Sequence, residues 1–332
     1  MALLSEDRTV AGAIEIFARR HRFRWYEVLP WLVAASCYVA FPNYLALGAQ
    51  VLAAILFGLS LDLVLGYAGI VTLGHAAFFG TGAYAAGLLA AHGWGEPLSG
   101  LLVAAAAAAA VGFVTGAVIL RTHGLTLLMQ TLMVATMLHE VANKANSITG
   151  GADGLQGMVV RPVFGLYRFD LFGKTAYWYC LGVLFIGWLV MRRIVFSPFG
   201  RSLTGVRENE ARMHAIGSPV FRRRLVAYTI SAALAGVSGA LIAQTTQFVA
   251  TDALGFERSG TILIMLLLGG IGRLYGAFIG VPLYMILQDR FAAIDPVYWY
   301  FWIGLLLVVV VMFFRGGAIG TGERLLQWLR RR

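Results

Sequence analysis

Ten long apolar runs, separated by short polar or glycine-rich segments, divide the sequence. A helix needs about 20 apolar residues to cross the hydrocarbon core of a bilayer, so most of these runs predict a membrane-spanning helix. The runs at 259–270 and 274–289 are short and interrupted by glycine, and half-helices that enter the membrane and turn back are the alternative there. The ten runs cover residues 28–47, 48–65, 74–91, 97–120, 124–146, 176–194, 225–247, 259–270, 274–289 and 297–314.

Composition points to the same class of protein. Of 332 residues, 59% are apolar and 13% are charged, whereas a soluble domain carries about 25% charged residues. So few charges could not cover the surface of a soluble two-domain enzyme, and the apolar content excludes a disordered chain. We therefore predict an all-α, polytopic membrane helical bundle with about ten crossings, eight being the alternative. The membrane domain is expected at 28–314, between a basic segment at 1–27 and a basic tail at 315–332.

The basic residues predict the orientation of these helices. With ten crossings, 20 of the 26 lysines and arginines fall on the side of the N-terminus and 6 on the other side. Loops on the cytoplasmic side of a membrane carry such an excess, so both termini are expected in the cytoplasm. The net charge of +10 is thereby assigned to membrane topology, and no nucleic-acid partner is expected. Residues 1–27 are expected to form an interfacial helix, with a frayed basic tail as an equal alternative.

Two stretches of the chain are similar to each other. Residues 61–84 and 261–284 align without gaps, with identities that include Gly69/Gly269, Gly80/Gly280 and Tyr84/Tyr284. An internal repeat is one explanation, and chance similarity of two glycine- and leucine-rich segments is the other. In transporters, glycine-broken segments at corresponding places of two repeats point to the substrate path.

Glycines and buried polar residues supply the candidates for such a path. The 40 glycines either let helices pack closely or break them, and a broken helix needs a protein-lined cavity to satisfy its backbone. Among ionisable residues at membrane depth, Glu140 is expected to pair with Lys144, one turn away. His75 is expected to be a hydrogen-bonding packing residue rather than a titrating group, and Asp62 lies near the inner end of its run.

Two apparent motifs, one typical of phosphate binding and one of zinc proteases, are incomplete. Gly173, Lys174 and Thr175 end like a phosphate-binding loop, but Arg168 stands where that loop needs its first glycine. His139 and Glu140 begin like a zinc-protease helix, but Asn143 replaces the second histidine ligand. We therefore expect no catalytic residue, no metal site and no cofactor in this chain.

The longest inner loop, 192–224, carries eight arginines and the acids Glu208 and Glu210. Its centre, 200–217, is compatible with a helix that has asparagine and acids at its start and glycine at its end. A helix of this kind at the membrane surface predicts a docking element. Contact of Arg222, Arg223 and Arg224 with anionic lipid is the alternative.

At these positions the sequence resembles the permease subunits of ABC importers for branched-chain amino acids, the LivM type. Residues 66–69 read GYAG, 73–80 read LGHAAFFG and 82–84 read GAY, close to a stretch of that family. The TGG at 149–151, the ISAALAG at 230–236 and the LGGIG at 268–272 follow in the same order. The family often has glutamine where this chain has Ile70.

The resemblance implies that transport requires several different subunits. A permease of this type works with a second homologous permease, two cytoplasmic ATPases that bind ATP and magnesium, and an external solute-binding protein, in the bacterial inner membrane. It implies that 200–217 is the coupling helix that docks on an ATPase. The coupling candidates are Gly200, Arg201, Arg207, Glu208, Glu210, Ala211 and Gly217. The pathway candidates are Gly69, Thr72, Gly74, His75, Thr149, Gly150, Gly151, Gly269, Gly270 and Gly272.

Two other classes of function compete with this one. A self-contained, ion-coupled secondary transporter or channel would be expected to bury carboxylates in its core, and this chain offers only Asp62 and Glu140, both near the ends of their runs. A membrane-embedded enzyme is disfavoured by the failed motifs. The expected function is therefore import of branched-chain amino acids or a similar small polar solute, and the sequence does not identify which solute.

Overall fold

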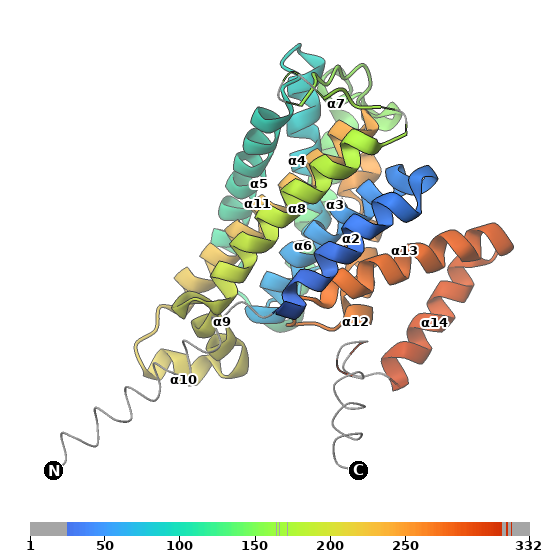
Figure 1. Cartoon of the computed structure of the whole chain (residues 1–332). Helices are drawn as coiled ribbons and strands as arrows, with labels where there is room; N and C mark the ends of the chain where they lie inside the picture. Colours follow the sequence, from blue (N-terminus) through green and yellow to red (C-terminus); the bar gives the residue numbers. More distant parts are fainter. Residues whose placement is uncertain are drawn as a thin grey trace, which may run out of the picture.

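The structure is a computed structural model that describes residues 25–163, 165, 167–170, 172–313, 317 and 320. Among these residues it contains thirteen α-helices and no β-strand, and two isolated β-bridges lie in loops. The expected all-α bundle is therefore confirmed (Figure 1). The expected basic segment at 1–27 lies outside the described residues except at its end, and the tail at 315–332 is described only at Gly317 and Gly320.

The helices follow the apolar runs. Their bounds are α2 (Leu29–Ala40), α3 (Leu45–Asp62), α4 (His75–Ala91), α5 (Pro97–Ile119), α6 (Gly124–Lys144), α7 (Asn146–Thr149), α8 (Lys174–Phe196), α9 (Pro198–Glu208), α10 (Glu210–Ala215), α11 (Val220–Thr246), α12 (Phe256–Gly269), α13 (Gly276–Ile294) and α14 (Trp299–Phe313). Short 3₁₀ helices are η1 (Trp25–Val28), η2 (Pro42–Tyr44), η4 (Gly151–Asp153) and η5 (Thr251–Leu254), and η3 (Leu63–Tyr67) is a π-helix.

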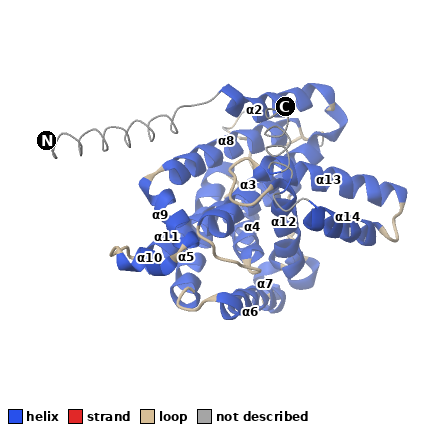
Figure 2. Ribbon diagram, turned by 90° about the horizontal axis from the view of Figure 1, so that it is seen from below, coloured by secondary structure: helices blue, strands red, loops and turns tan. Residues whose placement is uncertain are grey.

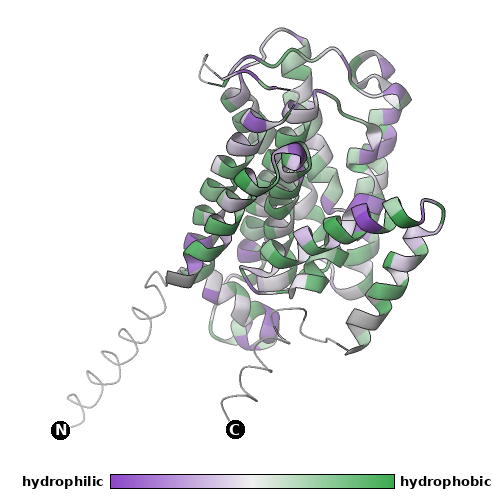
Figure 3. Ribbon diagram, turned by 45° about the vertical axis from the view of Figure 1, so that its right-hand side comes forward, coloured by the Kyte–Doolittle hydropathy of each residue, from purple (hydrophilic) through white to green (hydrophobic). Residues whose placement is uncertain are grey.

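Each of the ten apolar runs contains a helix, but the helices differ in length. Six described segments are long and apolar enough to cross a membrane: Pro42–Tyr67, Pro97–Ile119, Gly124–Lys144, Lys174–Phe196, Val220–Thr246 and Gly276–Ile294. The helices α2, α4, α12 and α14 are shorter. Apolar residues predominate along the helices, as expected where a bilayer surrounds them (Figure 3).

The long segment formed by α3 and η3 is the centre of the molecule. Every residue of α3 from Ile55 to Asp62 is buried, and α3 and α4 lie inside a ring of other helices when seen from the α9 end (Figure 2). Two serines of α11 bind the α3 backbone: Ser238 Oγ donates to Ala53 O at 2.7 Å, and Ser231 Oγ donates to Ser60 O. Such interhelical hydrogen bonds fix helix register without a charge.

Glycine and alanine set the spacing of α4, α5 and α11. A methyl group on Gly82 of α4 would meet the backbone of Gly236 in α11, and one on Gly239 would meet Phe79 O. A methyl group on Gly236 itself would meet the side chain of Ala108 in α5. Small residues at these crossings let the helix backbones touch, which is the usual packing solution in membranes.

The chain breaks twice at the end of the bundle that carries α9. Residues 68–74 separate η3 from α4, and 270–275 separate α12 from α13. The segments 61–84 and 261–284 therefore have the same helix–break–helix arrangement, in agreement with the proposed repeat. The equivalence is not residue by residue, because Gly69 has φ +71° whereas at the second break the positive φ, +116°, falls on Gly270.

The helix α12 begins near mid-depth of the bundle and runs to the break beside Arg207 of α9, so it does not enter and turn back as the alternative for the short apolar run allowed. The preceding η5 lies beside α4, where a methyl group on Gly80 would meet Leu254. One turn later the guanidinium of Arg258 lies 4.7 Å from the ring centroid of Phe79. Phe79 in turn contacts Phe57, at 4.8 Å between ring centroids, near the middle of the Pro42–Tyr67 span. The expected position of Arg258 in an outer loop is therefore wrong.

Candidate transport pathway and coupling element

A cavity of about 710 Å³ lies at this mid-depth level between α3, α4, α6, α11, η5, α12 and α13. Gln50, Ala54 and Phe57 of α3 line it, and these residues surround the middle of the Pro42–Tyr67 span. The volume is within the range of small-molecule sites. A cavity at this depth, bordered by the start of a short helix, has the position of a substrate site in a transporter.

Three charged residues line the cavity: Asp252 of η5, and Glu257 and Arg258 in the first turn of α12. The Arg258 guanidinium lies over the face of Phe79 and within electrostatic range of the Asp252 carboxylate. A cation over an aromatic face is stabilised by the negative charge of the ring. Ionisable groups at this depth are costly, so their presence beside a cavity indicates a functional site.

The rest of the lining is largely apolar, with a few neutral polar groups. Apolar side chains come from α3, α4, α11, α12 and α13, and neutral polar groups come from α3, α11, α12 and α13. These lining residues include Ile242, Ile262, Met265 and Met285 on the apolar side and Gln50, Thr246, Thr261 and Gln288 on the polar side. His139 of α6, set aside above as a metal ligand, also lines the cavity. The cavity therefore offers opposite charges and an apolar wall to the same ligand.

Sequence reasoning missed this site, although a signal was present. The apolar run 259–270 has twelve residues, too few to cross a bilayer as a helix. The charged residues directly before it, Glu257 and Arg258, therefore had to lie within the membrane thickness rather than at its surface. Their neighbours across the cavity could not be inferred, because they come from distant parts of the chain.

Four predicted pathway residues lie at the first break, below the cavity. His75 is 1% exposed, stacks on Phe57 and lies with Nε2 2.8 Å from Ser60 Oγ, so its expected packing role is confirmed. Thr72 Oγ1 accepts a hydrogen bond from Gly74 N at 3.2 Å, and a methyl group on Gly74 would meet Thr131 O. These residues hold the start of α4 in the protein interior, and they do not line the cavity.

The free amides at the start of α4 find partners on other helices. Ser259 Oγ of α12 accepts from Ala76 N at 2.8 Å, and Thr131 Oγ1 of α6 accepts from Leu73 N at 3.3 Å. A helix start buried without such partners would leave unsatisfied donors. These bonds tie the first break to α12 and α6.

Asp62 and Arg207 connect the two breaks, because each contacts Gly272 of the second break and lies in or beside the first. Gly272 N donates to Asp62 Oδ1 at 2.7 Å, and Asp62 is 1% exposed. Arg207 of α9 donates from Nη1 to Gly66 O, and its side chain lies against both Gly69 and Gly272. The predicted coupling residue Arg207 is therefore in contact with the predicted pathway residues Gly69 and Gly272. Gly269 and Gly270 lie beside them, packed against Gly276 of α13.

The predicted outer group forms a separate turn at the opposite end. Thr149 Oγ1 donates to Ala145 O at 2.9 Å, and Gly150 and Gly151 follow with φ of +77° and +57°. Beyond this turn, Leu155 pairs with Val249, whose side chain lines the cavity. The outer turn therefore reaches the cavity only through its neighbours. Glu140 and Lys144 nearby form the expected ion pair, at 3.4 Å.

The inner loop contains two helices where one was expected. Ser197 caps α9 by accepting from Gly200 N at 3.2 Å, and Asn209 caps α10 by accepting from Arg212 N at 2.9 Å. Asn209 has extended backbone angles, so the chain turns between the helices. The predicted continuous helix over 200–217 is wrong, because an asparagine side chain competes with the helical backbone for its own amides.

The predicted end of this element is confirmed, since Gly217 follows α10 with φ +76°. Of the other coupling candidates, Arg201, Glu208 and Ala211 are exposed on α9 and α10. An exposed helix pair held rigidly at one end of the bundle is suited to contact with another protein.

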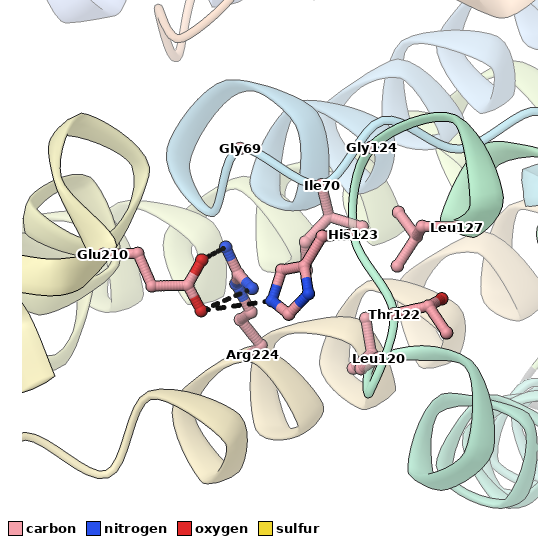
Figure 4. Close-up of a pocket in the computed structure, with 9 residues that line it drawn as sticks. All are labelled: Gly69, Ile70, Leu120, Thr122, His123, Gly124, Leu127, Glu210 and Arg224. Carbon is pink, nitrogen blue, oxygen red and sulfur yellow. Dashed lines mark hydrogen bonds and ion pairs between the residues drawn. The ribbon is translucent and has the colours of Figure 1, made fainter.

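Glu210, at the start of α10, joins three parts of the chain (Figure 4). Its two carboxylate oxygens accept hydrogen bonds of 3.0 and 2.9 Å from Arg224 of α11. His123 Nε2, in the turn between α5 and α6, lies 3.3 Å from Oε1. A small cavity of about 250 Å³ separates this cluster from Gly69 and Ile70. Glu210 thus fixes α10 to the bundle, next to the first break.

Exchanging the charges of Glu210 and Arg224 tests this attachment. Glu210→Arg or Arg224→Glu alone should speed amide hydrogen exchange of residues 209–217 by about fivefold, since a partly exposed pair is worth about 1 kcal/mol. The double exchange should restore slow exchange. Reversal of the exposed Lys144 at the other end, Lys144→Glu, should leave these amides unchanged. Equal protection in the single variants and the unaltered chain would contradict the role of the pair.

The chain is similar to known transport proteins. Residues 43–311 match the model of the family described as branched-chain amino acid transport system / permease component. The chain is 29% identical over 262 residues to the high-affinity branched-chain amino acid transport system permease protein LivM of Salmonella typhimurium, and equally to that of Escherichia coli. Each alignment covers 71% of this chain and 60% of the relative, so the chain spans about 60% of the length of these two relatives.

A third relative is archaeal. The probable branched-chain amino acid transport permease protein LivM of Methanocaldococcus jannaschii is 28% identical over 269 residues, which cover 69% of this chain and 76% of the relative. No solved structure matches the chain.

Proposed function

The chain belongs to the family of branched-chain amino acid transport system permease components, and on that premise we propose that it is the membrane-spanning permease subunit of an ATP-driven importer. Its solute is proposed to be a branched-chain amino acid, as the names of its relatives indicate for those proteins. One structural observation supports the proposal most directly. The helix pair α9–α10 is held through Arg207 against both helix breaks, so a partner docked on α9 could move them.

We propose that α9 and α10 lie in the cytoplasm and that the chain resides in the bacterial inner membrane. The arginine-rich end of the bundle, which includes Arg192, Arg193 and Arg222–Arg224, supports this orientation. Ten passes are proposed, with both termini on the α9 side. In the eighth pass the chain descends without a long helix through η5 and completes the crossing as α12.

The proposed partners are a second homologous permease, two ATPases that dock on α9–α10, and an external solute-binding protein. ATP and magnesium are assigned to the ATPases, so no hydrolytic step is proposed for this chain. The proposal is supported by family membership and by the exposed acids and arginines of α9–α10, which suit a polar docking surface.

Uptake of labelled leucine tests the function. Cells that lack the gene should lose high-affinity uptake of ¹⁴C-leucine by at least about tenfold, a change equivalent to 1.4 kcal/mol, and expression of the full chain should restore it. Uptake should stop when ATP is depleted and persist when the proton gradient is collapsed at constant ATP. Leucine accumulation by the purified chain alone in liposomes, driven by a proton or sodium gradient, would instead establish the ion-coupled transporter that we rank second.

A further inference from the structure

The mid-depth cavity carries a combination of charges that matches one chemical class of ligand. Glu257 and Arg258 are adjacent in the first turn of α12, both line the cavity, and Asp252 of η5 lies within electrostatic range of Arg258. Within the described part of the chain, no hydrogen bond or ion pair engages the Glu257 carboxylate. The site therefore presents one carboxylate without a partner, one guanidinium, and a second carboxylate within electrostatic range of that guanidinium.

The start of α12 strengthens the cationic side of the site. The helix has 14 residues, and no side chain caps its first turn. Arg258 N donates to Gly255 O at 3.2 Å, and the amides of Phe256 and Glu257 before it carry partial positive charge that attracts an anion. Half-helices that begin at mid-depth in transporters direct this end toward anionic groups of the substrate.

The opposite wall is apolar. Ile242, Ile262, Met265 and Met285 line the same cavity as the charged residues. A ligand with both charges at one end and an aliphatic branch at the other would satisfy each part of the lining. A free carboxylate or amine would leave one of these charged side chains without an opposite charge, which lowers the electrostatic complementarity of the complex.

We propose that this cavity is a transient binding site for a zwitterionic aliphatic α-amino acid, whose carboxylate contacts Arg258 and the start of α12 and whose ammonium group contacts Glu257. The side chain of the ligand lies against the wall formed by Ile262 and Met285. The charges then alternate from Glu257 through the ligand to Arg258 and Asp252. This inference rests on the proposed function, because it assigns the place in the permease where the solute is held during passage.

Thermal unfolding of the full chain, purified with its co-purifying subunits in lipid nanodiscs, tests the site. Saturating l-leucine should raise the unfolding midpoint. Leucinamide, which lacks the carboxylate, and 4-methylpentanoate, which lacks the ammonium group, should need at least about tenfold higher concentrations, since each loses one charge-assisted contact. Arg258→Gln and Glu257→Gln should weaken the leucine response by a similar factor, and Arg258→Lys should retain part of it.

Arg290→Gln is the matched control, because Arg290 is exposed on α13 and does not line the cavity. A midpoint that leucine does not move, a leucine response in Arg258→Gln and Glu257→Gln equal to that of the unaltered chain, or an equal response to 4-methylpentanoate would each overturn the site. The cell assay separates this from the proposed function. Gene-dependent leucine uptake that survives in Arg258→Gln rejects the site alone, whereas leucine uptake that never depends on the gene rejects the function.

Discussion

Arg207→Gln should lower ATP-driven leucine uptake about ten- to a hundredfold while the chain remains inserted and folded. The Arg207 guanidinium donates to Gly66 O and lies against Gly272, which itself donates to the buried Asp62. Contacts made by a charged group are worth about 1.5–3 kcal/mol, which corresponds to one to two orders of magnitude in a rate. Glutamine is too short to keep both contacts, so movement of α9 would no longer reach the two breaks.

Two measurements distinguish loss of coupling between ATP hydrolysis and transport from loss of folding or assembly. ATP hydrolysis by the assembled complex should continue in Arg207→Gln, and the variant should elute from gel filtration as the unaltered chain does. Arg168→Gln provides the same substitution at an exposed position at the other end of the bundle, and its uptake should be normal. Full uptake by Arg207→Gln would show that α9 communicates with the pathway by another route.

Gly239→Ala should destabilise the chain by about 3 kcal/mol or more. A methyl group at this position would overlap Phe79 O and reach within 3.0 Å of Ala83 N. Overpacking of a core commonly costs about 1–3 kcal/mol, and backbone atoms cannot turn aside as a side chain does. The crossing of α4 and α11 would have to widen, so the yield of folded protein and its unfolding midpoint should both fall.

Gly182→Ala is the matched comparison. Gly182 also lies in a long helix, α8, but a methyl group there meets nothing within 4 Å. Alanine favours a helix over glycine by about 1 kcal/mol, so this variant should be as stable as the unaltered chain or more stable. Equal stability of the two variants would mean that the α4–α11 crossing is not tightly packed.

Much of the fold follows from the apolar pattern. The runs at 97–120 and 124–146 correspond to α5 and α6 within two residues, since a long apolar run between polar segments has only the helix available in a membrane. Both helix breaks also lie where glycines cluster. Asparagine and acids were expected at the start of the docking helix, and Asn209 does cap α10. The turn that separates α10 from α9 was missed because residues 200–208 before it are also compatible with a helix.

The candidate site was harder to predict because it depends on how deep each residue lies in the membrane. Sequence reasoning identified the glycines that build the two breaks but not the cavity above them, which is lined by seven separate elements. Arg258 was assigned to the outer surface because charged residues usually lie at the surface of the membrane rather than within it. Its position is set by its contact with Phe79, 179 positions earlier in the chain, and apolar periodicity holds no information about such a contact.

Because α12 begins near mid-depth, the membrane voltage falls across only part of the thickness of this protein. Solvent that enters the mid-depth cavity leaves only the half nearest α9 as an insulator, and there Gly58 faces Ala277 and Gly269 faces Gly276 in direct contact. The whole electrical potential then falls across this thin layer, so the field within it is about twice as steep as in the surrounding bilayer. Any loosening of these glycine contacts would open a leak for ions before it opened a route for the solute.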